Sequence, residues 1–366
     1  LSKVYSSCEK HTGEVAYFIE QVTGHLIPDM RYALKYGVKA MLNDIAEKKK
    51  TASDEQIKNY EAMEIALDCV LILTKRYKAI ADEMLANAEG ERKEQLTLLS
   101  DTLAKVPYES CETLYEAIQS FMLLWEIMCL EQAPNPFAFS VGNADRIFEP
   151  YREKDNLSRE ETAALFKHFL VFFNVADRSW AISQNLIVSG RDVDGNDLTN
   201  LSTYALLDAY YDMNLPQPIL SVKLHKNTPD KLYEELGRFF FTPGCLTPSL
   251  FNDDSLFKVL PLAGVDIEDV PDTSIAGCQE PLIMGKDNAN TTNSWFNLGK
   301  ILELTLNDGY SLITGEEIGT VCEKTDALSA LKNVRERFYK NAQFYCDAMI
   351  NAANGASRAI SHLPVP

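Results

Sequence analysis

The sequence lacks several signatures of common functional sites. Its eight cysteines include no CxxC or CxxxC pair, and its five histidines are dispersed, with none at the spacing of metal ligands. In a chain of 366 residues this scatter argues against a disulfide framework and a zinc site, and it favours reduced thiols in a cytoplasm. It also leaves no local Ser-His-Asp or Cys-His arrangement for nucleophilic catalysis. We therefore expect no bound metal.

Long apolar runs and excess positive charge are absent as well. The run Phe121 to Leu130 is short and carries Glu126, so no stretch approaches the roughly 18 apolar residues of a membrane span. Acidic residues outnumber basic ones by 53 to 35, which gives a net charge of -18. Such a chain repels phosphate backbones and anionic membranes. We expect neither nucleic acid nor a membrane as a partner.

Apolar residues make up 46% of the chain, which is typical of a globular protein. The chain is too long for one simple hydrophobic core, so we expect two domains or one large α/β architecture. Asp29 to Lys49 has helical spacing, Ser53 is placed to cap a long second helix, and Cys111 to Leu130 predicts another. The first third of the chain is therefore predicted to form a helical shell.

Strand and helix patterns alternate further along the chain. Ala181 to Val188 predicts a buried strand and Leu215 to Leu224 a second one, with a helix from Leu198 to Tyr211 between them. Ser158 and Glu161 form a capping-box pattern that opens another helix. This alternation predicts βαβ units and a largely parallel sheet, whose functional residues gather at the carboxyl ends of its strands.

The most informative stretch is Gly277-Cys278-Gln279-Glu280-Pro281. Gly277 and Pro281 disfavour a helix and favour an extended or tightly looped backbone, and in an extended chain residues two apart project to the same side. We therefore expect Cys278 and Glu280 to share one face and to act together on one small substrate. On these residues alone, a buried structural thiol beside a solvated glutamate is the simpler interpretation.

Other segments accompany this stretch in a fixed order. They are Gly24-His25 with Pro28, Tyr115-Glu116-Ala117-Ile118-Gln119, Val141-Gly142-Asn143-Ala144-Asp145-Arg146 with Pro150-Tyr151, Gly195 to Asn200, Pro218 to Val222, Pro248 to Asp254, and Phe296-Asn297-Leu298. Together with Gly277-Cys278-x-Glu280-Pro281, these segments resemble the glycyl radical enzymes, the pyruvate formate-lyase-like superfamily. The resemblance spans almost the whole chain.

The resemblance implies a fold of the α/β class. A helical shell would surround a ten-stranded α/β barrel made of two antiparallel five-stranded half-sheets, with Cys278 on a central finger loop. Residues 1–366 would form part of one pyruvate formate-lyase-like domain. Residues 1–131 would be mainly helical shell, and residues 132–366 would supply barrel strands, helices and the Cys loop.

The resemblance also implies radical chemistry. In such enzymes a separate S-adenosylmethionine iron-sulfur activase places a radical on a glycine near the C-terminus, and the cysteine receives it. The expected glycine signature, Arg-Val-x-Gly-aromatic, does not occur before Pro366, and the chain begins at Leu1 without Met. We therefore expect a central fragment without the glycine-radical domain, inactive alone and binding no cofactor itself. A small-molecule substrate and the activase are its expected partners, and we expect a homodimer in the cytoplasm of an anaerobic bacterium.

The residue before Cys278 bears on the reaction. Pyruvate formate-lyases carry two adjacent cysteines, whereas the neighbour here is Gly277. Cys-x-Glu instead resembles the eliminases, which cleave C–O, C–N or C–S bonds, and the arylacetate decarboxylases. In an eliminase, a Cys278 thiyl radical would remove a hydrogen atom beside a hydroxyl group. Glu280 would take the hydroxyl proton as base, and the neighbouring group would leave.

Four positions are candidate substrate-binding residues: Phe137, Ser183, Thr292 and Trp295. By the spacing from Gly142 and Phe296, Phe137 and Thr292 fall where the diol dehydratases carry polar partners for a polyol, so glycerol and propanediol are disfavoured. Phe137 and Trp295 would suit an aromatic or quaternary-ammonium substrate, although core packing is an equal alternative for Trp295.

A non-catalytic relative or partial subunit that acts by binding is the alternative of another class. The missing glycine signature favours it. So do Asn143 and Arg146, which replace the Arg and Gln of the family's GRxDQ-type element. If those two residues support the substrate site, that support is altered here.

Overall fold

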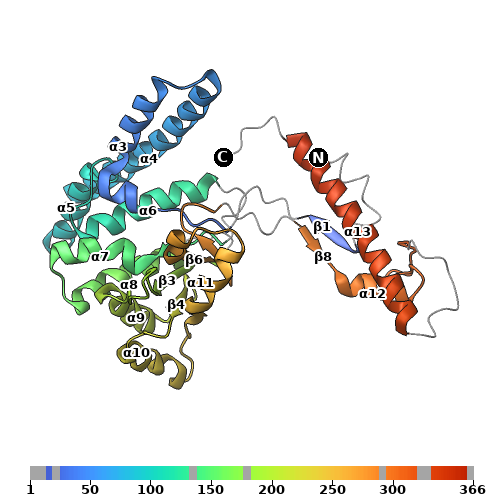
Figure 1. The fold of residues 1–366 in the computed structure, drawn as a ribbon. Coiled ribbons are helices and arrows are strands. Elements are labelled where there is room, and N and C mark those ends of the chain that lie inside the picture. The colour runs from blue at the N-terminus through green and yellow to red at the C-terminus, as the bar shows by residue number, and fades with distance from the viewer. Residues whose placement is uncertain are drawn as a thin grey trace. The chain divides into compact units, whose positions relative to one another are not determined.

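A computed structural model describes residues 14–18, 25–131, 138–175, 183–287, 294–319 and 331–360. The chain divides into two compact units (Figure 1). The larger unit is Val22–Thr291, and the smaller unit combines Leu1–Gln21 with Thr292–Pro366.

Helices make up the first part of the larger unit. They are α3 (Arg31–Lys49), α4 (Asp54–Ala86), α5 (Gly90–Lys105) and α6 (Leu114–Glu131). The predicted cap of α4 is confirmed: the Ser53 hydroxyl accepts a hydrogen bond from the Gln56 backbone N–H, and the Gln56 side chain accepts one from the Ser53 N–H. Among the described residues no helix is long and apolar enough to cross a membrane.

A parallel sheet follows, with the described strands in the order β2 (Gly142–Asn143), β3 (Asn185–Ser189), β4 (Ile219–Leu224) and β5 (Ser249–Asn252). The helices between and after them are α7 (Ala144–Asp155), α8 (Arg159–Val175), α9 (Leu201–Met213), α10 (Asp230–Phe241) and α11 (Asp253–Leu262). The predicted α/β class and parallel sheet are confirmed. The ten-stranded barrel stays a prediction.

Helix α9 begins later than its sequence pattern predicts. Asn200 has an extended backbone, and its side-chain oxygen accepts a hydrogen bond from the Thr203 N–H at 3.0 Å. This cap satisfies an N–H group that has no partner within the helix. The helix therefore starts at Leu201 and not at Leu198.

The two central strands, β3 and β4, have faces of opposite character. Successive side chains of a strand point to opposite faces, so Leu186, Val188, Leu220 and Val222 share one of them. These four side chains belong to the same buried core as the phenylalanines of α6, α7 and α8. Burying one such aliphatic side chain contributes about 1.5–3 kcal/mol. The apolar face therefore holds the sheet to the helices.

The opposite face is largely polar although it is buried, and Ile187 of β3 is an apolar residue on it. Asn185, Ser221 and Lys223 alternate with the apolar residues and are all 0% exposed. Polar groups are buried at this density only where they find hydrogen-bond partners. A lysine side chain is rarely fully buried at all. Here the partners come from a β-hairpin that lies on this face.

The hairpin consists of β6 (Thr273–Ala276) and β7 (Glu280–Ile283), and the 3-10 helix η1 (Ile267–Asp272) leads into it. Lys223, near the carboxyl end of β4, donates to the Pro271 and Thr273 carbonyls at 2.9 Å each. Asn185, the first residue of β3, donates to the Gly277 carbonyl at 3.3 Å. The base of the hairpin therefore lies near the carboxyl ends of the strands, and its tip near their amino ends.

The smaller unit pairs β1 (Ala16–Phe18) with β8 (Ser294–Phe296) in antiparallel register and adds α12 (Leu298–Leu306) and α13 (Leu331–Ile360). Asn297 caps α12, because its side-chain oxygen accepts a hydrogen bond from the Lys300 N–H at 2.9 Å. This cap gives the Phe296-Asn297-Leu298 sequence a structural role at a strand-to-helix junction.

Candidate functional site

Cys278 lies at the tip of the β6–β7 hairpin. Ala276 pairs with Glu280 in the hairpin register, so Gly277, Cys278 and Gln279 form the turn between them. Of the two backbones that Gly277 and Pro281 favour, extended or tightly looped, the structure has the tight loop. The turn forms because Gly277 adopts the left-handed region with φ of +60°, which other residues adopt at a cost. Cys278 is a free thiol on the exposed side of the turn.

His25 packs against the inner side of this turn. A Cβ atom at position 277 would lie 2.8 Å from His25 Nε2 and 3.1 Å from Glu280 Oε2. Only a glycine leaves room for both groups at these distances. His25 Nε2 lies 3.7 Å from Glu280 Oε1, close enough for electrostatic interaction and too long for a hydrogen bond. The turn thus brings a carboxylate and an imidazole together and carries the Cys278 thiol two residues before that carboxylate.

The imidazole and the carboxylate differ in their exposure. The His25 side chain is 3% exposed and that of Glu280 is 37% exposed. Burial lowers the pKa of His25, and the nearby charge of Glu280 raises it by less. The ring is therefore neutral at neutral pH, while one oxygen of Glu280 accepts a hydrogen bond from the Gln279 N–H at 3.0 Å. Once Glu280 has taken up a proton, a neutral imidazole within hydrogen-bond distance can receive that proton and return it.

The polar face of the sheet supports the same turn. Asn185 donates through its side-chain nitrogen to the Ser221 hydroxyl at 2.9 Å as well as to the Gly277 carbonyl. Its backbone N–H donates to the Ser140 hydroxyl at 3.1 Å. These contacts hold the turn beside the amino end of β3. The expectation that functional residues gather at the carboxyl ends of the strands is therefore not met by this hairpin, because its tip reaches back along the sheet.

A sequence model of the family described as Pyruvate formate lyase-like matches residues 5–364. The chain belongs to this family. The predicted resemblance to the glycyl radical enzymes is thereby confirmed. The chain is 30% identical over 347 residues to the trans-4-hydroxy-L-proline dehydratase of Clostridioides difficile, covering 89% of this chain and 42% of that protein. It is 26% identical over 325 residues to the (2S)-3-sulfopropanediol dehydratase of Klebsiella oxytoca, covering 84% and 39%.

Solved structures of the pyruvate formate lyase-like fold agree with the larger and smaller units alike. The hydroxyproline dehydratase of Clostridioides difficile, with substrate bound, matches with a TM-score of 0.83 and 26% identity, covering 98% of this chain and 48% of that one. A structure on 1,2-propanediol dehydration in Roseburia inulinivorans gives a TM-score of 0.89 at 22% identity, covering 99% and 49%. The chain thus spans about half the length, or less, of the relatives it matches.

The predicted substrate-binding residues are distributed over separate parts of the chain. Ser183 lies two residues before β3 and is half-buried, with a φ of +60°. Phe137 and Thr292 lie outside the described residues. Trp295 lies in β8 of the smaller unit, opposite Tyr17. All four stay predictions.

His25 is the residue that the sequence did not single out. It was visible only as part of the Gly24-His25 and Pro28 element, which carries the family resemblance and says nothing of its contacts. His25 and Glu280 lie 3.7 Å apart in space but 255 positions apart in the sequence, from 25 to 280. No local sequence pattern therefore indicates their contact. The only local signal for His25 that a single sequence offers is a histidine among apolar residues shortly before a predicted helix.

A cavity of about 1020 Å³ lies in the helical layer, between α4, α5, α6 and α8, and its lining includes Ile80, Leu99, Met122 and Phe172. None of Cys278, Glu280 and His25 lines it. No three His, Cys, Asp or Glu side chains of the described residues lie close enough together to hold a metal ion. The hairpin tip is therefore the candidate site.

Replacing Gly277 by alanine is expected to destabilise the hairpin by about 2–3 kcal/mol, roughly 1 for the left-handed backbone and the rest for displacing His25 or Glu280. Gly90→Ala is a matched control, since Gly90 has a φ of +56° and a Cβ there would meet nothing within 4 Å. Urea unfolding of both variants measures the difference. A loss in Gly277→Ala no larger than in Gly90→Ala would show that the turn does not need the close approach.

Proposed function

We propose that this chain carries the thiyl and base residues of a glycyl radical lyase. Its substrate is a small molecule with a leaving group on the carbon next to a hydroxyl-bearing carbon, and the bond cleaved is C–O, C–N or C–S. The observation that carries the proposal is the hairpin tip, where Cys278 is followed by Glu280 in contact with the buried His25. The relatives named as dehydratases and as an isethionate sulfite-lyase support this reaction class.

The steps follow from what each side chain can do. The glycyl radical, installed by an S-adenosylmethionine iron-sulfur activase, supplies the radical that Cys278 receives. The Cys278 thiyl takes a hydrogen atom from the hydroxyl-bearing carbon and becomes a thiol. Glu280 takes the hydroxyl proton, which leaves a ketyl radical that expels the neighbouring group with its electron pair. The product radical then regains a hydrogen atom from Cys278, which restores the thiyl.

Glu280 and His25 manage the proton in this scheme. A departing hydroxide needs a proton, and the proton that Glu280 has taken is the nearest one. His25 is neutral and lies 3.7 Å from Glu280, so it can take this proton only when the two side chains close to hydrogen-bond distance, and its burial then favours return of the proton to Glu280. Cys278 is exposed on the turn, so a substrate can approach its thiol.

The remaining parts of the proposal concern the complete protein. We propose that the parallel sheet forms part of a ten-stranded barrel around the hairpin, and that Phe137, Ser183, Thr292 and Trp295 contact the substrate. A homodimer and an activase are its proposed partners. An arylacetate decarboxylase is a second candidate, favoured by 25% identity over 283 residues to the indoleacetate decarboxylase of Tractidigestivibacter scatoligenes.

An anaerobic screen of the complete protein with its activase tests the proposal. Hydroxyproline, isethionate, choline, diols and arylacetates are offered separately, and carbonyl products and carbon dioxide are measured. Elimination products from any of the first four groups support a lyase, and carbon dioxide from an arylacetate supports the decarboxylase. A glycyl radical signal without turnover of any compound, or no radical at all, contradicts both and favours a relative that acts by binding.

A further inference from the structure

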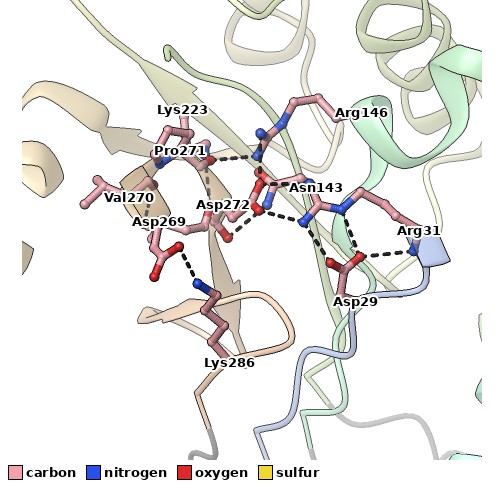
Figure 2. A network of polar contacts seen from close by, with 11 residues as sticks. Asp29, Arg31, Asn143, Arg146, Lys223, Asp269, Val270, Pro271, Asp272 and Lys286 are labelled. Carbon is pink, nitrogen blue, oxygen red and sulfur yellow. Dashed lines mark hydrogen bonds and ion pairs between the residues drawn. The ribbon is translucent and has the colours of Figure 1, made fainter. Parts of the chain in front are cut away.

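Asp272 lies at the base of the Cys278 hairpin, where η1 ends and β6 begins. Figure 2 shows its carboxylate between two arginines. Arg31, from the start of α3, donates to both oxygens at 2.6 and 3.2 Å, and Arg146 of α7 donates to one at 3.1 Å. The Asp272 backbone carbonyl accepts from the Asn143 side chain at 3.2 Å and from the Met284 N–H at 3.1 Å.

The neighbouring backbone is held in the same way. The Pro271 carbonyl accepts from Arg146 at 2.7 Å and from Lys223 at 2.9 Å, and Lys223 also reaches the Thr273 carbonyl (Figure 2). Lys223 is fully buried, and burial together with the charge of Arg146 lowers its pKa to about 8. Three cationic side chains from three separate elements therefore converge on residues 271–273.

This concentration of charge is a costly way to hold a hairpin. Lys223 is buried and the Arg146 side chain is 17% exposed, while those of Asp272 and Arg31 are 26% and 40% exposed. Charges removed from water lose hydration that their pairing only partly restores, and apolar packing of the same volume often stabilises as well or better. Charged, directional contacts instead fix one geometry. A two-stranded hairpin alone is marginally stable, and this one has its tip exposed at Cys278 and Gln279. The Asn185 contact to the Gly277 carbonyl holds the tip, and the base fixes the strands that lead to it, so the position of the tip depends on both.

The same contacts show the structural role of Asn143 and Arg146. The sequence suggested that these two residues alter the support of the substrate site. In the structure both bind the base of the hairpin, at the Pro271 carbonyl and Asp272. Their effect on the site therefore passes through the hairpin and its tip.

We infer that Asp272 is a positioning residue for Cys278. With Arg31, Arg146 and Lys223 it fixes the base of the β6–β7 hairpin, and so sets where Cys278 and Glu280, which the hairpin carries together, stand relative to His25. The inference rests on the proposed function of Cys278 and Glu280, because positioning matters only if they react together. Misplacing a reacting group by about 1 Å can lower a rate about 100-fold.

The test compares Asp272→Ala with Asp269→Ala. Asp269 lies three residues earlier in η1, and its carboxylate pairs at 2.5 Å with Lys286, whose side chain is 61% exposed, so its loss removes a surface ion pair at the same base. Hydrogen exchange of residues 273–283 is measured on this chain. We expect at least about tenfold faster exchange in Asp272→Ala, less than about twofold in Asp269→Ala, and no change in α8 and α9.

In the complete activated enzyme, Asp272→Ala is expected to lower kcat about 10- to 100-fold, with KM and the glycyl radical content unchanged. Asp272→Asn, which keeps the oxygen acceptor and loses the charge, is expected to lie between wild type and alanine. Asp272→Asn also provides the test if the alanine variant does not fold.

Two results overturn the inference. One is hairpin exchange in Asp272→Ala equal to that in Asp269→Ala, and the other is faster exchange with an unchanged kcat. A wild-type enzyme that forms the radical and turns over no substrate contradicts the proposed function instead. The exchange data distinguish that failure, because they need no catalysis.

Discussion

Cys278→Ala is expected to abolish turnover in the complete, activated enzyme, lowering kcat by at least about 10⁴-fold. The thiol, as a thiyl radical, is the only group at the hairpin tip that can accept a hydrogen atom and return it. His25 and Glu280 can exchange protons but not hydrogen atoms. Alanine at the centre of the turn removes one atom from an exposed side chain and leaves Gly277, which shapes the turn, in place. The glycyl radical signal measured by electron paramagnetic resonance should therefore still form.

Cys69→Ala provides the control for this result. Cys69 is another exposed free cysteine, placed on α4 in the helical layer, and its loss should change neither signal nor turnover. Retained turnover in Cys278→Ala would remove the thiyl step from the mechanism. A missing radical signal together with lost turnover would indicate that the substitution disturbs the fold, which the unfolding curve of the variant would then show.

The sequence predicted the framework of the larger unit because its signals are local. Ser53 and Ser158 cap helices through contacts three residues away, and both patterns are confirmed. In β4, Leu220, Ser221, Val222 and Lys223 alternate between apolar and polar, which is the period of a strand. The same alternation predicts that the strand has one apolar and one polar face. It does not predict that the polar face is buried.

The hairpin was less predictable, since its contacts join distant parts of the chain. Arg31 meets Asp272 across 241 positions and Arg146 meets it across 126. A single sequence carries no signal for such pairs. The backbone at Cys278 stayed open between two alternatives for a local reason, because Gly277 and Pro281 are consistent with either a strand or a tight turn. The family resemblance singled out Cys278, whose role stays a prediction, and left its geometry open.

Glu280→Gln is expected to spare the glycyl radical and to lower kcat for elimination about 10²- to 10⁴-fold, the range of a lost general base. The amide keeps the shape of the side chain and can still accept the hydrogen bond from the Gln279 N–H. It cannot take a proton from the substrate hydroxyl. The radical content and the rate of product formation, measured on the same activated sample, separate these two effects.

A second readout of the same variant needs no catalysis. The charge of Glu280 raises the pKa of His25 against the effect of burial, so removing that charge should lower the pKa further. Nuclear magnetic resonance titration of the His25 ring, assigned with His25→Gln, measures this shift in the present chain. Glu268→Gln, which changes an exposed carboxylate of η1, should leave both the titration and the rate unchanged. Product formation by Glu280→Gln at the wild-type rate would place the base elsewhere. An unchanged His25 titration would show instead that the two side chains do not interact, which would remove His25 from the proton path.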